Sequence, residues 1–246
     1  MPLHSIPLCP LLKIPLLITH AVCTWWSATP PRPPPPVEEQ KHLPAPDVFS
    51  NTLPFLIHLV TACKWVYYGA ALAEITVLVA QHLPNSSIAD SVVSFLLQTP
   101  DASLQLTTLS CAACMLGILG GLLRIWCYRT LGEFFTWEAS VQREHKLITD
   151  GPYAIVRHPS YTGAAMMNAG NFLLLLSEGS YVAEAGWLRN SWGRAVVFGV
   201  IGYMSYITYS LIRRAVKEDA MLEKEFGLRW QQWAKRTPYR IVPHVY

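Results

Sequence analysis

Long apolar stretches, separated by short polar connections, are the feature that most restricts how this chain can fold. No Lys or Arg occurs between Lys64 and Arg124. Hydrophobic residues make up 52% of the sequence and charged residues 14%, and this charge content is low for a soluble domain. Stretches apolar enough for membrane helices cover residues 53–81, 106–127, 161–176 and 192–212. We therefore expect an all-α, polytopic integral membrane helical bundle with four to five transmembrane helices.

The chain divides into four regions by composition. Residues 1–27 are apolar but interrupted by prolines and by Lys13. They could form a signal anchor, a cleaved signal or a short first span, and we favour an uncleaved anchor. Residues 28–50 predict an extended Pro-rich linker. Residues 51–127 should contain the N-terminal transmembrane helices, and residues 128–246 carry the polar motifs described below.

The distribution of basic residues predicts how the chain crosses the membrane. Residues 124–157 and 213–240 are both rich in Lys and Arg, so the positive-inside rule places both on the cytosolic face. The two apolar stretches between them then cross the membrane and return. The connection 82–104 lacks Lys and Arg, and it should lie on the far side together with the glycosylation sequon at Asn85. Both basic segments should thus meet at one end of a helical hairpin.

Glycines and cysteines in the apolar stretches have packing interpretations. Gly117, Gly120 and Gly121 follow no strand, so they indicate close helix packing rather than a nucleotide loop. We therefore expect no Rossmann domain. Cys111 and Cys114 have metal or redox spacing but no second pair, and we interpret them as packing residues. No metal site is expected, and no basic run with interleaved aromatics indicates nucleic acid.

Two charged residues, Lys64 and Glu74, interrupt the first credible span. Their spacing does not make them near neighbours on one helix. We expect the Lys64 side chain to extend to the membrane surface and Glu74 to face protein, rather than a proton path.

Residues 145–163 form the first polar motif. A Gly-Pro pair predicts a turn, and Pro159 disfavours helical geometry for the residue before it. Arg157, His158 and Tyr161 should therefore lie on a bent backbone at the end of a membrane segment. A small-molecule site is expected at such a place. Spacing alone leaves open the alternative of a membrane-surface loop.

A second polar motif follows the last apolar stretch. Arg214 and Glu218 are four residues apart, so they should share one face of a helix just beyond a membrane span. Taken alone, the pair could be a simple surface ion pair.

The two motifs resemble those of a known family. Residues 147–153 running into 157–163 are similar to the signature of the isoprenylcysteine carboxyl methyltransferase family. Residues 214–218 resemble its C-terminal block, which continues here with Glu225-Phe-Gly227, Trp230 and Pro238. The blocks occur in the family's order with an apolar hairpin between them. The resemblance extends from about Gln142 to the C-terminus, so residues 128–246 would be the catalytic region.

The resemblance implies a protein-S-isoprenylcysteine O-methyltransferase that uses S-adenosyl-L-methionine. Its substrates would be prenylated, CaaX-processed proteins with a C-terminal farnesyl- or geranylgeranylcysteine. It would lie in the endoplasmic reticulum membrane, with its cofactor site facing the cytosol. The residues that match cofactor-binding positions of the family are Gln142, His145, Lys146, Leu147, Ile148, Tyr153, His158, Pro159, Ser160, Tyr161 and Glu218.

Gln142 matches only when a gap is allowed. Arg214 matches the residue that faces the methyl acceptor, so the resemblance implies that it binds substrate and takes part in catalysis. Arg157 could contact cofactor or substrate, or it could anchor to lipid phosphate, and the sequence does not separate these roles.

Other functions remain compatible with the sequence. A phospholipid N-methyltransferase would use the same cofactor with an amine acceptor, which must lose a proton to a nearby base. A membrane sterol reductase, whose C-terminal region is similar to this family, would use a nicotinamide phosphate and should need more spans. A non-catalytic membrane protein that retains the motif would bind no cofactor.

Overall fold

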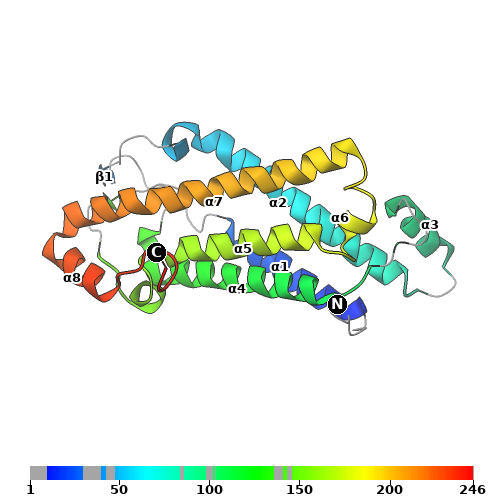
Figure 1. The fold of residues 1–246 in the computed structure, drawn as a ribbon, viewed down its shortest axis with the longest axis horizontal. Coiled ribbons are helices and arrows are strands. Elements are labelled where there is room, and N and C mark those ends of the chain that lie inside the picture. Colours follow the sequence, from blue (N-terminus) through cyan, green and yellow to red (C-terminus); the bar gives the residue numbers. More distant parts are fainter. Residues whose placement is uncertain are drawn as a thin grey trace.

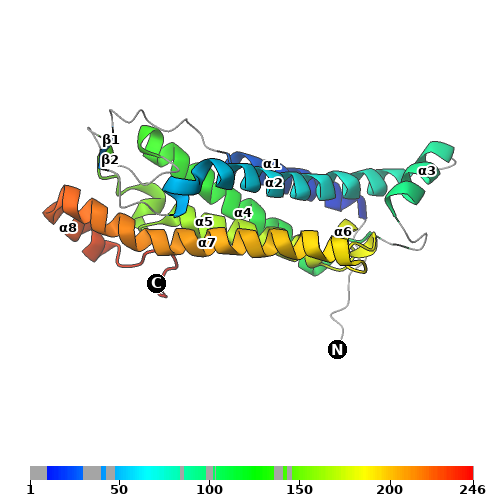
Figure 2. The same cartoon turned by 90° about the horizontal axis from the view of Figure 1, so that it is seen from above.

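The computed structural model describes residues 10–29, 40–42, 48–83, 86–97, 102, 104–135, 141–142 and 146–245. Its main helices lie side by side along the longest axis of the molecule (Figures 1 and 2). The helices are α1 (Lys13–Ser27), α2 (Val48–Ala80), α3 (Ser87–Leu96), α4 (Thr108–Leu131), α5 (Pro159–Leu176), α6 (Tyr181–Glu184), α7 (Ser191–Phe226) and α8 (Leu228–Arg236). Short 3₁₀ helices cover Pro10–Leu12 (η1), Gly132–Phe134 (η3) and Gly151–Ala154 (η4). The strands β1 (Gln40–His42) and β2 (Val141–Gln142) pair antiparallel.

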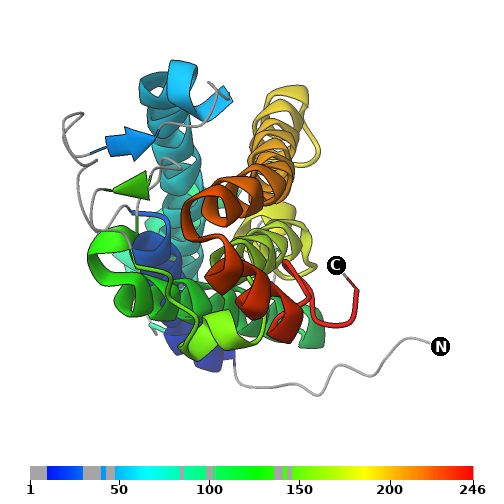
Figure 3. The ribbon, with the colours of Figure 1, turned by 90° about the vertical axis from the view of Figure 1, so that its left-hand side faces the viewer.

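The prediction of an α-helical membrane bundle is confirmed. Three helical segments within the described residues are long and apolar enough to cross a membrane: His58–Ala80, Thr108–Phe134 and Ser191–Phe226. This is fewer than the four to five that hydropathy predicted. Helix α1, with 15 residues, is shorter than a span needs. Helix α5 has 18 residues, but it contains Asn168 and Asn171 and is less apolar than the three long segments. Both shorter helices pack along the longer ones (Figure 3).

Small residues bring α4 and α5 into close contact. A Cβ added to Gly120 would lie 2.6 Å from the carbonyl oxygen of Gly163, and one added to Gly163 would lie 2.7 Å from that of Gly120. The two backbones are equally close about two turns further along α5, where a Cβ on Gly170 would lie 2.6 Å from the backbone of Gly117. These glycines therefore let the two backbones touch. The packing interpretation of the glycine-rich stretch is confirmed.

Helix α1 is part of the bundle through a buried ion pair. Lys13 has no exposed surface, forms an ion pair with Glu74 of α2, and donates to the carbonyl oxygens of Gln105 and Gly179, both at 2.9 Å. Glu74 also accepts the backbone N–H of Tyr181 at 3.0 Å. The expectation that Glu74 faces protein is therefore correct. Its partner is Lys13, which lies on a different helix.

The predicted Pro-rich linker falls mostly outside the described residues, as does Asn85. Helix α2 begins at Val48, inside the end of the predicted linker 28–50. Lys64 of α2 donates to the Thr29 hydroxyl at 3.2 Å and lies over the Trp25 ring, so its ammonium reaches the C-terminal end of α1.

Helix α7 is longer than its apolar stretch. The side chain of Asn190 caps its first turn by accepting the N–H of Gly193 at 2.6 Å. The helix ends at Phe226, and the next residue, Gly227, has a φ of 53°, a conformation that favours glycine. Residues 213–226 are polar but continue the helix. An apolar stretch indicates which residues lie in the membrane, and a helix can extend beyond it. The second polar motif is thereby carried past the bundle on a rigid element.

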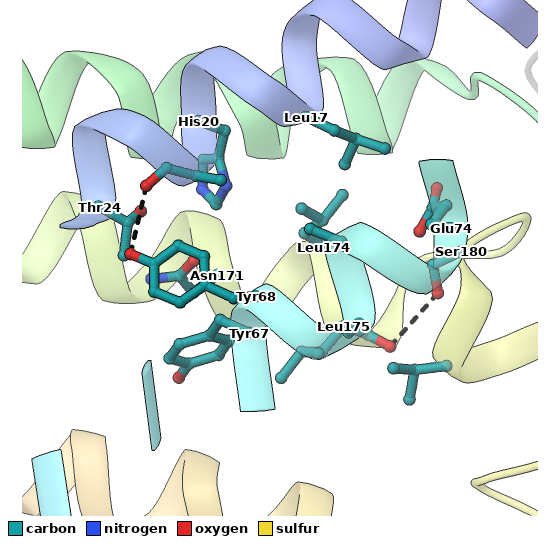
Figure 4. Close-up of a pocket in the computed structure, with 14 residues that line it drawn as sticks. Leu17, His20, Thr24, Tyr67, Tyr68, Glu74, Asn171, Leu174, Leu175 and Ser180 are labelled. Atoms are coloured by element: carbon teal, nitrogen blue, oxygen red, sulfur yellow. Dashed lines mark hydrogen bonds between the residues drawn. The ribbon is translucent and has the colours of Figure 1, made fainter. Parts of the chain in front are cut away.

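A small cavity lies between α1, α2 and α5. It has a volume of about 30 Å³, and Figure 4 shows His20, Thr24 and Asn171 gathered at one end of it. A cavity of this size holds at most about two water molecules. It is therefore too small for a nucleoside cofactor, and the functional site must be sought where the polar motifs meet.

Candidate active site

The first polar motif forms a bent segment between α4 and α5. Gly151 has a φ of 59°, a conformation that favours glycine, and it opens the short helix η4. Pro159 occupies the first position of α5, where its missing N–H costs nothing. His158 precedes it with φ −125° and ψ 59°, outside the helical region. The local sequence thus turns Arg157 and His158 inward, and both are 7% exposed.

The second polar motif meets the first through Glu218. Arg214 and Glu218 share one face of α7, with Nε of Arg214 2.9 Å from Oε1 of Glu218, as the spacing predicted. The hydroxyl of Tyr161 donates to the same oxygen at 2.7 Å. Nδ1 of His158 lies 3.3 Å from Oε2 of Glu218. The structure therefore brings these four predicted residues into one cluster at one end of the bundle.

Asp219, the residue after Glu218, completes this cluster and was not predicted. Nε2 of His158 lies 3.0 Å from its Oδ1, and Nη2 of Arg157 lies 3.0 Å from its Oδ2. Nε of Arg240 donates to Oδ2 at 2.8 Å. Successive residues on a helix point about 100° apart, so Glu218 and Asp219 face different neighbours. The adjacent acidic pair was the available signal, but the sequence does not say which cations each would meet.

His158 lies between two carboxylates, which favour its charged form. Each ring nitrogen faces an oxygen, of Glu218 on one side and Asp219 on the other, and both nitrogens donate only in the imidazolium. Burial disfavours the charge, but the hydrogen bonds to Asp219 and Glu218 outweigh it, so the pKa of His158 is raised above its ordinary value of 6.5. The ring stacks on that of Tyr161, with centroids 5.6 Å apart.

Tyr153 forms an apolar wall beside the charged cluster. It is 7% exposed and packs with Cys127 and Trp233, and Leu147 and Ile148 cover this group. Nε1 of Trp233 in α8 donates to the backbone carbonyl oxygen of Tyr153 at 3.1 Å. Burial raises the pKa of the Tyr153 hydroxyl well above its ordinary value, so it stays protonated as a hydrogen-bond donor.

The remaining residues of the predicted site lie around this core or outside the described residues. Ser160 is buried, and its carbonyl and hydroxyl oxygens accept from Arg124 at 3.0 and 3.3 Å. Lys146 is exposed. The backbone of Gln142 pairs with Gln40 in the short sheet, but its side chain is not described. His145 lies outside the described residues.

Arg157 is paired within the protein on all sides of its guanidinium. Its Nε and Nη2 bind Asp219, and its Nη1 donates to the carbonyl oxygens of Thr237 and Pro238, both at 2.9 Å. With 7% of its surface exposed, it is too buried to anchor to lipid phosphate. It acts within the protein, because a buried guanidinium needs its N–H groups paired.

Fold and site together define an integral membrane helical protein whose polar site is assembled from the start of α5, the polar end of α7 and the C-terminal segment. Residues 112–193 match the model of the isoprenylcysteine carboxyl methyltransferase (ICMT) family. The match contains the first polar motif and ends before the second. It confirms the family resemblance that the motifs predicted.

Curated relatives include two methyltransferases and several sterol reductases. The chain is 31% identical over 123 residues to protein-S-isoprenylcysteine O-methyltransferase B of Arabidopsis thaliana, covering 49% of this chain and 53% of that protein. It is 30% identical over 125 residues to protein-S-isoprenylcysteine O-methyltransferase of Schizosaccharomyces pombe, covering 50% and 45%. A Delta(14)-sterol reductase of Mus musculus is 29% identical over 101 residues, covering 41% of this chain and 20% of that protein. The chain thus spans about half the length of the methyltransferases it matches.

Proposed function

We propose that this chain is an S-adenosyl-L-methionine-dependent methyltransferase that methylates the C-terminal α-carboxylate of farnesyl- or geranylgeranylcysteine in proteins. The observation that carries the proposal is the contact between the two polar motifs, in which Glu218 of α7 meets His158 and Tyr161 at the start of α5. The family match over residues 112–193 supports it.

The charged cluster fits the polar groups of the cofactor, which are an ammonium, a carboxylate and a sulfonium. When bound, the cofactor supplies an electrophilic methyl group. Glu218 is 18% exposed, so it can hold the ammonium or offset positive charge. Both ring nitrogens of His158 face carboxylates, so this residue would act by holding Glu218, and Tyr153 would donate a hydrogen bond to a polar group of the cofactor. Tyr161 would keep Glu218 in place through its hydroxyl.

The surroundings of this cluster also suit a ligand with an apolar part. Leu147 and Ile148 pack beside Tyr153. Nε1 of Trp230 is buried and has no hydrogen-bond partner within the part of the chain that the structure describes, and a buried donor of this kind normally has one. A ligand could provide it. His145, Lys146, Pro159, Ser160 and Gln142 are assigned to the cofactor from the family resemblance alone.

Arg214 would bind the carboxylate that accepts the methyl group. It is 5% exposed, and its Nε is held by Glu218, which fixes the plane of the guanidinium. A guanidinium can bind a carboxylate through two parallel N–H bonds, which would set the acceptor oxygen in line with the methyl group. No general base is needed, because an α-carboxylate with a pKa of about 3.5 is already deprotonated at neutral pH. Such alignment contributes on the order of several kcal/mol.

The membrane position of the site suits this substrate. A prenyl chain would enter from the bilayer between helices while its cysteine carboxylate reaches the polar cluster, and exclusion of water would strengthen the electrostatic contacts there. By the positive-inside rule, the basic segments at this end of the bundle support a site that faces the cytosol. We propose the endoplasmic reticulum as its membrane.

Methyl transfer from labelled S-adenosylmethionine tests the proposal directly. The purified protein in lipid should label farnesylcysteine or geranylgeranylcysteine and leave phosphatidylethanolamine unlabelled. Labelling of the phospholipid alone would favour an N-methyltransferase instead. Because several relatives are sterol reductases, the same protein should also be titrated with NADPH. Binding of NADPH without binding of S-adenosylmethionine would favour a reductase-like protein.

A further inference from the structure

The C-terminal segment 237–241 lies along the junction where the candidate site begins. The backbone N–H groups of Arg157 and His158 donate to the carbonyl oxygens of Tyr239 and Arg240, at 2.9 and 2.7 Å. The Thr162 hydroxyl donates to the carbonyl oxygen of Ile241. Figure 1 shows this segment, in red, folded back over the start of α5. The C-terminal segment 237–241 therefore forms part of the candidate site.

Asp219 links this segment to the charged cluster around Glu218. It is 3% exposed and accepts hydrogen bonds from Arg157 of the junction, from Arg240 of the C-terminal segment and from His158. A buried carboxylate is stable only when it is paired and hydrogen-bonded in this way. In return, its charge balances cations from two parts of the chain that would otherwise repel each other.

The orientation of His158 depends on Asp219. With Nε2 bound to Asp219 and Nδ1 facing Glu218, the ring can satisfy both carboxylates in one orientation, and stacking on Tyr161 supports the same plane. Removal of the charge at Asp219 takes away one of the two partners of the imidazolium. The ring is then free to lose its proton or to rotate, and Glu218 loses the N–H that faces its Oε2.

We propose that Asp219 is a positioning residue through which the C-terminal segment 237–241 holds His158, and thereby Glu218, in the geometry that binds the cofactor. This inference rests on the proposed methyltransferase function. Asp219 is bound by Arg157, Arg240 and His158, so its effect on the cofactor is exerted through His158.

The test is calorimetric titration of the protein in lipid nanodiscs with S-adenosylhomocysteine, from pH 6 to 9. Asp219→Asn keeps the side-chain size and one acceptor oxygen but removes the charge. We expect its affinity to fall about tenfold, the order of one lost charge-assisted hydrogen bond. The charged groups around His158 are Glu218, Asp219 and Arg214 on α7, Arg157 beside it and Arg240 on the C-terminal segment. Affinity should decline at alkaline pH as His158 loses its proton. Because a neighbouring carboxylate favours the protonated ring, loss of the charge at Asp219 should move this decline to lower pH.

Two further variants separate this role from a general loss of structure. Asp90→Asn changes an exposed aspartate of α3 at the opposite end of the molecule and should leave affinity and pH profile unchanged. Arg240→Ala removes the cation of the C-terminal segment and leaves the Arg157–Asp219 pair. It should lower affinity about two- to fivefold, as for a partly exposed ion pair. It also decides the matter if Asp219→Asn does not fold.

The outcomes are distinct. If the unmodified protein does not bind S-adenosylhomocysteine, the proposed function itself is wrong. If it binds, and Asp219→Asn keeps the same affinity and the same pH profile, the positioning role is overturned. Unchanged affinity in Arg240→Ala, should the aspartate variant fail to fold, would overturn it equally.

Discussion

Nδ1 of His158, at the start of α5, lies 3.3 Å from Oε2 of Glu218 in α7. The two residues come from polar motifs that an apolar helical hairpin separates in the sequence. Their contact joins the two motifs into one site. The proposed methyltransferase function depends on this contact.

Arg214 and the His158–Glu218 pair should have separable roles. Arg214→Ala should lower turnover about a hundredfold or more, the order found for loss of one positioned charge-stabilising donor, with cofactor affinity largely retained. Glu218→Ala or His158→Ala should weaken cofactor binding itself. Steady-state kinetics and calorimetry would measure both effects, and Arg194→Ala, an exposed arginine at the other end of α7, is the matched control. Equal loss of cofactor affinity in all three site variants would contradict this division.

His158 should make stability depend on pH. Its pKa is raised in the folded protein by Asp219 and Glu218, so its contribution is fully present below the unfolded pKa of about 6.5. That contribution is lost as pH rises through the folded pKa. Thermal unfolding in detergent between pH 6 and 9 should therefore show a decline that His158→Gln reduces. A pH dependence that His158→Gln leaves unaltered would show that this histidine is not held charged.

Gly120 should tolerate no side chain. Gly120→Ala would place a Cβ 2.6 Å from the backbone of α5, and overpacking of this kind costs about 1–3 kcal/mol. Gly202→Ala in α7 is the matched control, because nothing lies within 4 Å of the added Cβ and alanine favours the helix. Thermal unfolding should fall for the first variant and hold or rise for the second. Equal stability of the two would disprove close packing of α4 on α5.

The Lys13–Glu74 pair should anchor α1 in the bundle. Lys13→Ala leaves Glu74 buried without its cation, which costs about 3–5 kcal/mol. The joint change Lys13→Met with Glu74→Leu should cost less, because no buried charge remains. Lys224→Ala, on an exposed position of α7, should have little effect on unfolding temperature. Equal destabilisation by the single and the joint change would show that the unpaired charge of Glu74 is not the cause of the loss in stability.

Much of the architecture could be predicted because it follows from local patterns. Apolar stretches located α2, α4, α5 and α7, and the glycines of α4 indicated close packing. The four-residue spacing of Arg214 and Glu218 indicated a shared helix face. The length of α7 could not be predicted, since its apolar stretch ends at Ile212 while the helix continues to Phe226.

The missed contacts are those that join distant parts of the chain. The nearest cation to Glu74 on its own helix is Lys64, whereas its partner in the fold, Lys13, lies on α1. Asp219 and Arg240 were not predicted because pairing among several nearby arginines is decided by how the C-terminal segment folds back. Such a choice depends on tertiary geometry, which spacing along one helix does not contain.

The most direct test of the central claim is a double-mutant cycle on cofactor affinity with His158→Ala and Glu218→Ala. If the two motifs hold the cofactor jointly, each single variant should weaken binding about tenfold. The double variant should then be little weaker than either single, because residues in contact are not additive. Strictly additive losses, or no loss in either single variant, would contradict a site that the two motifs share.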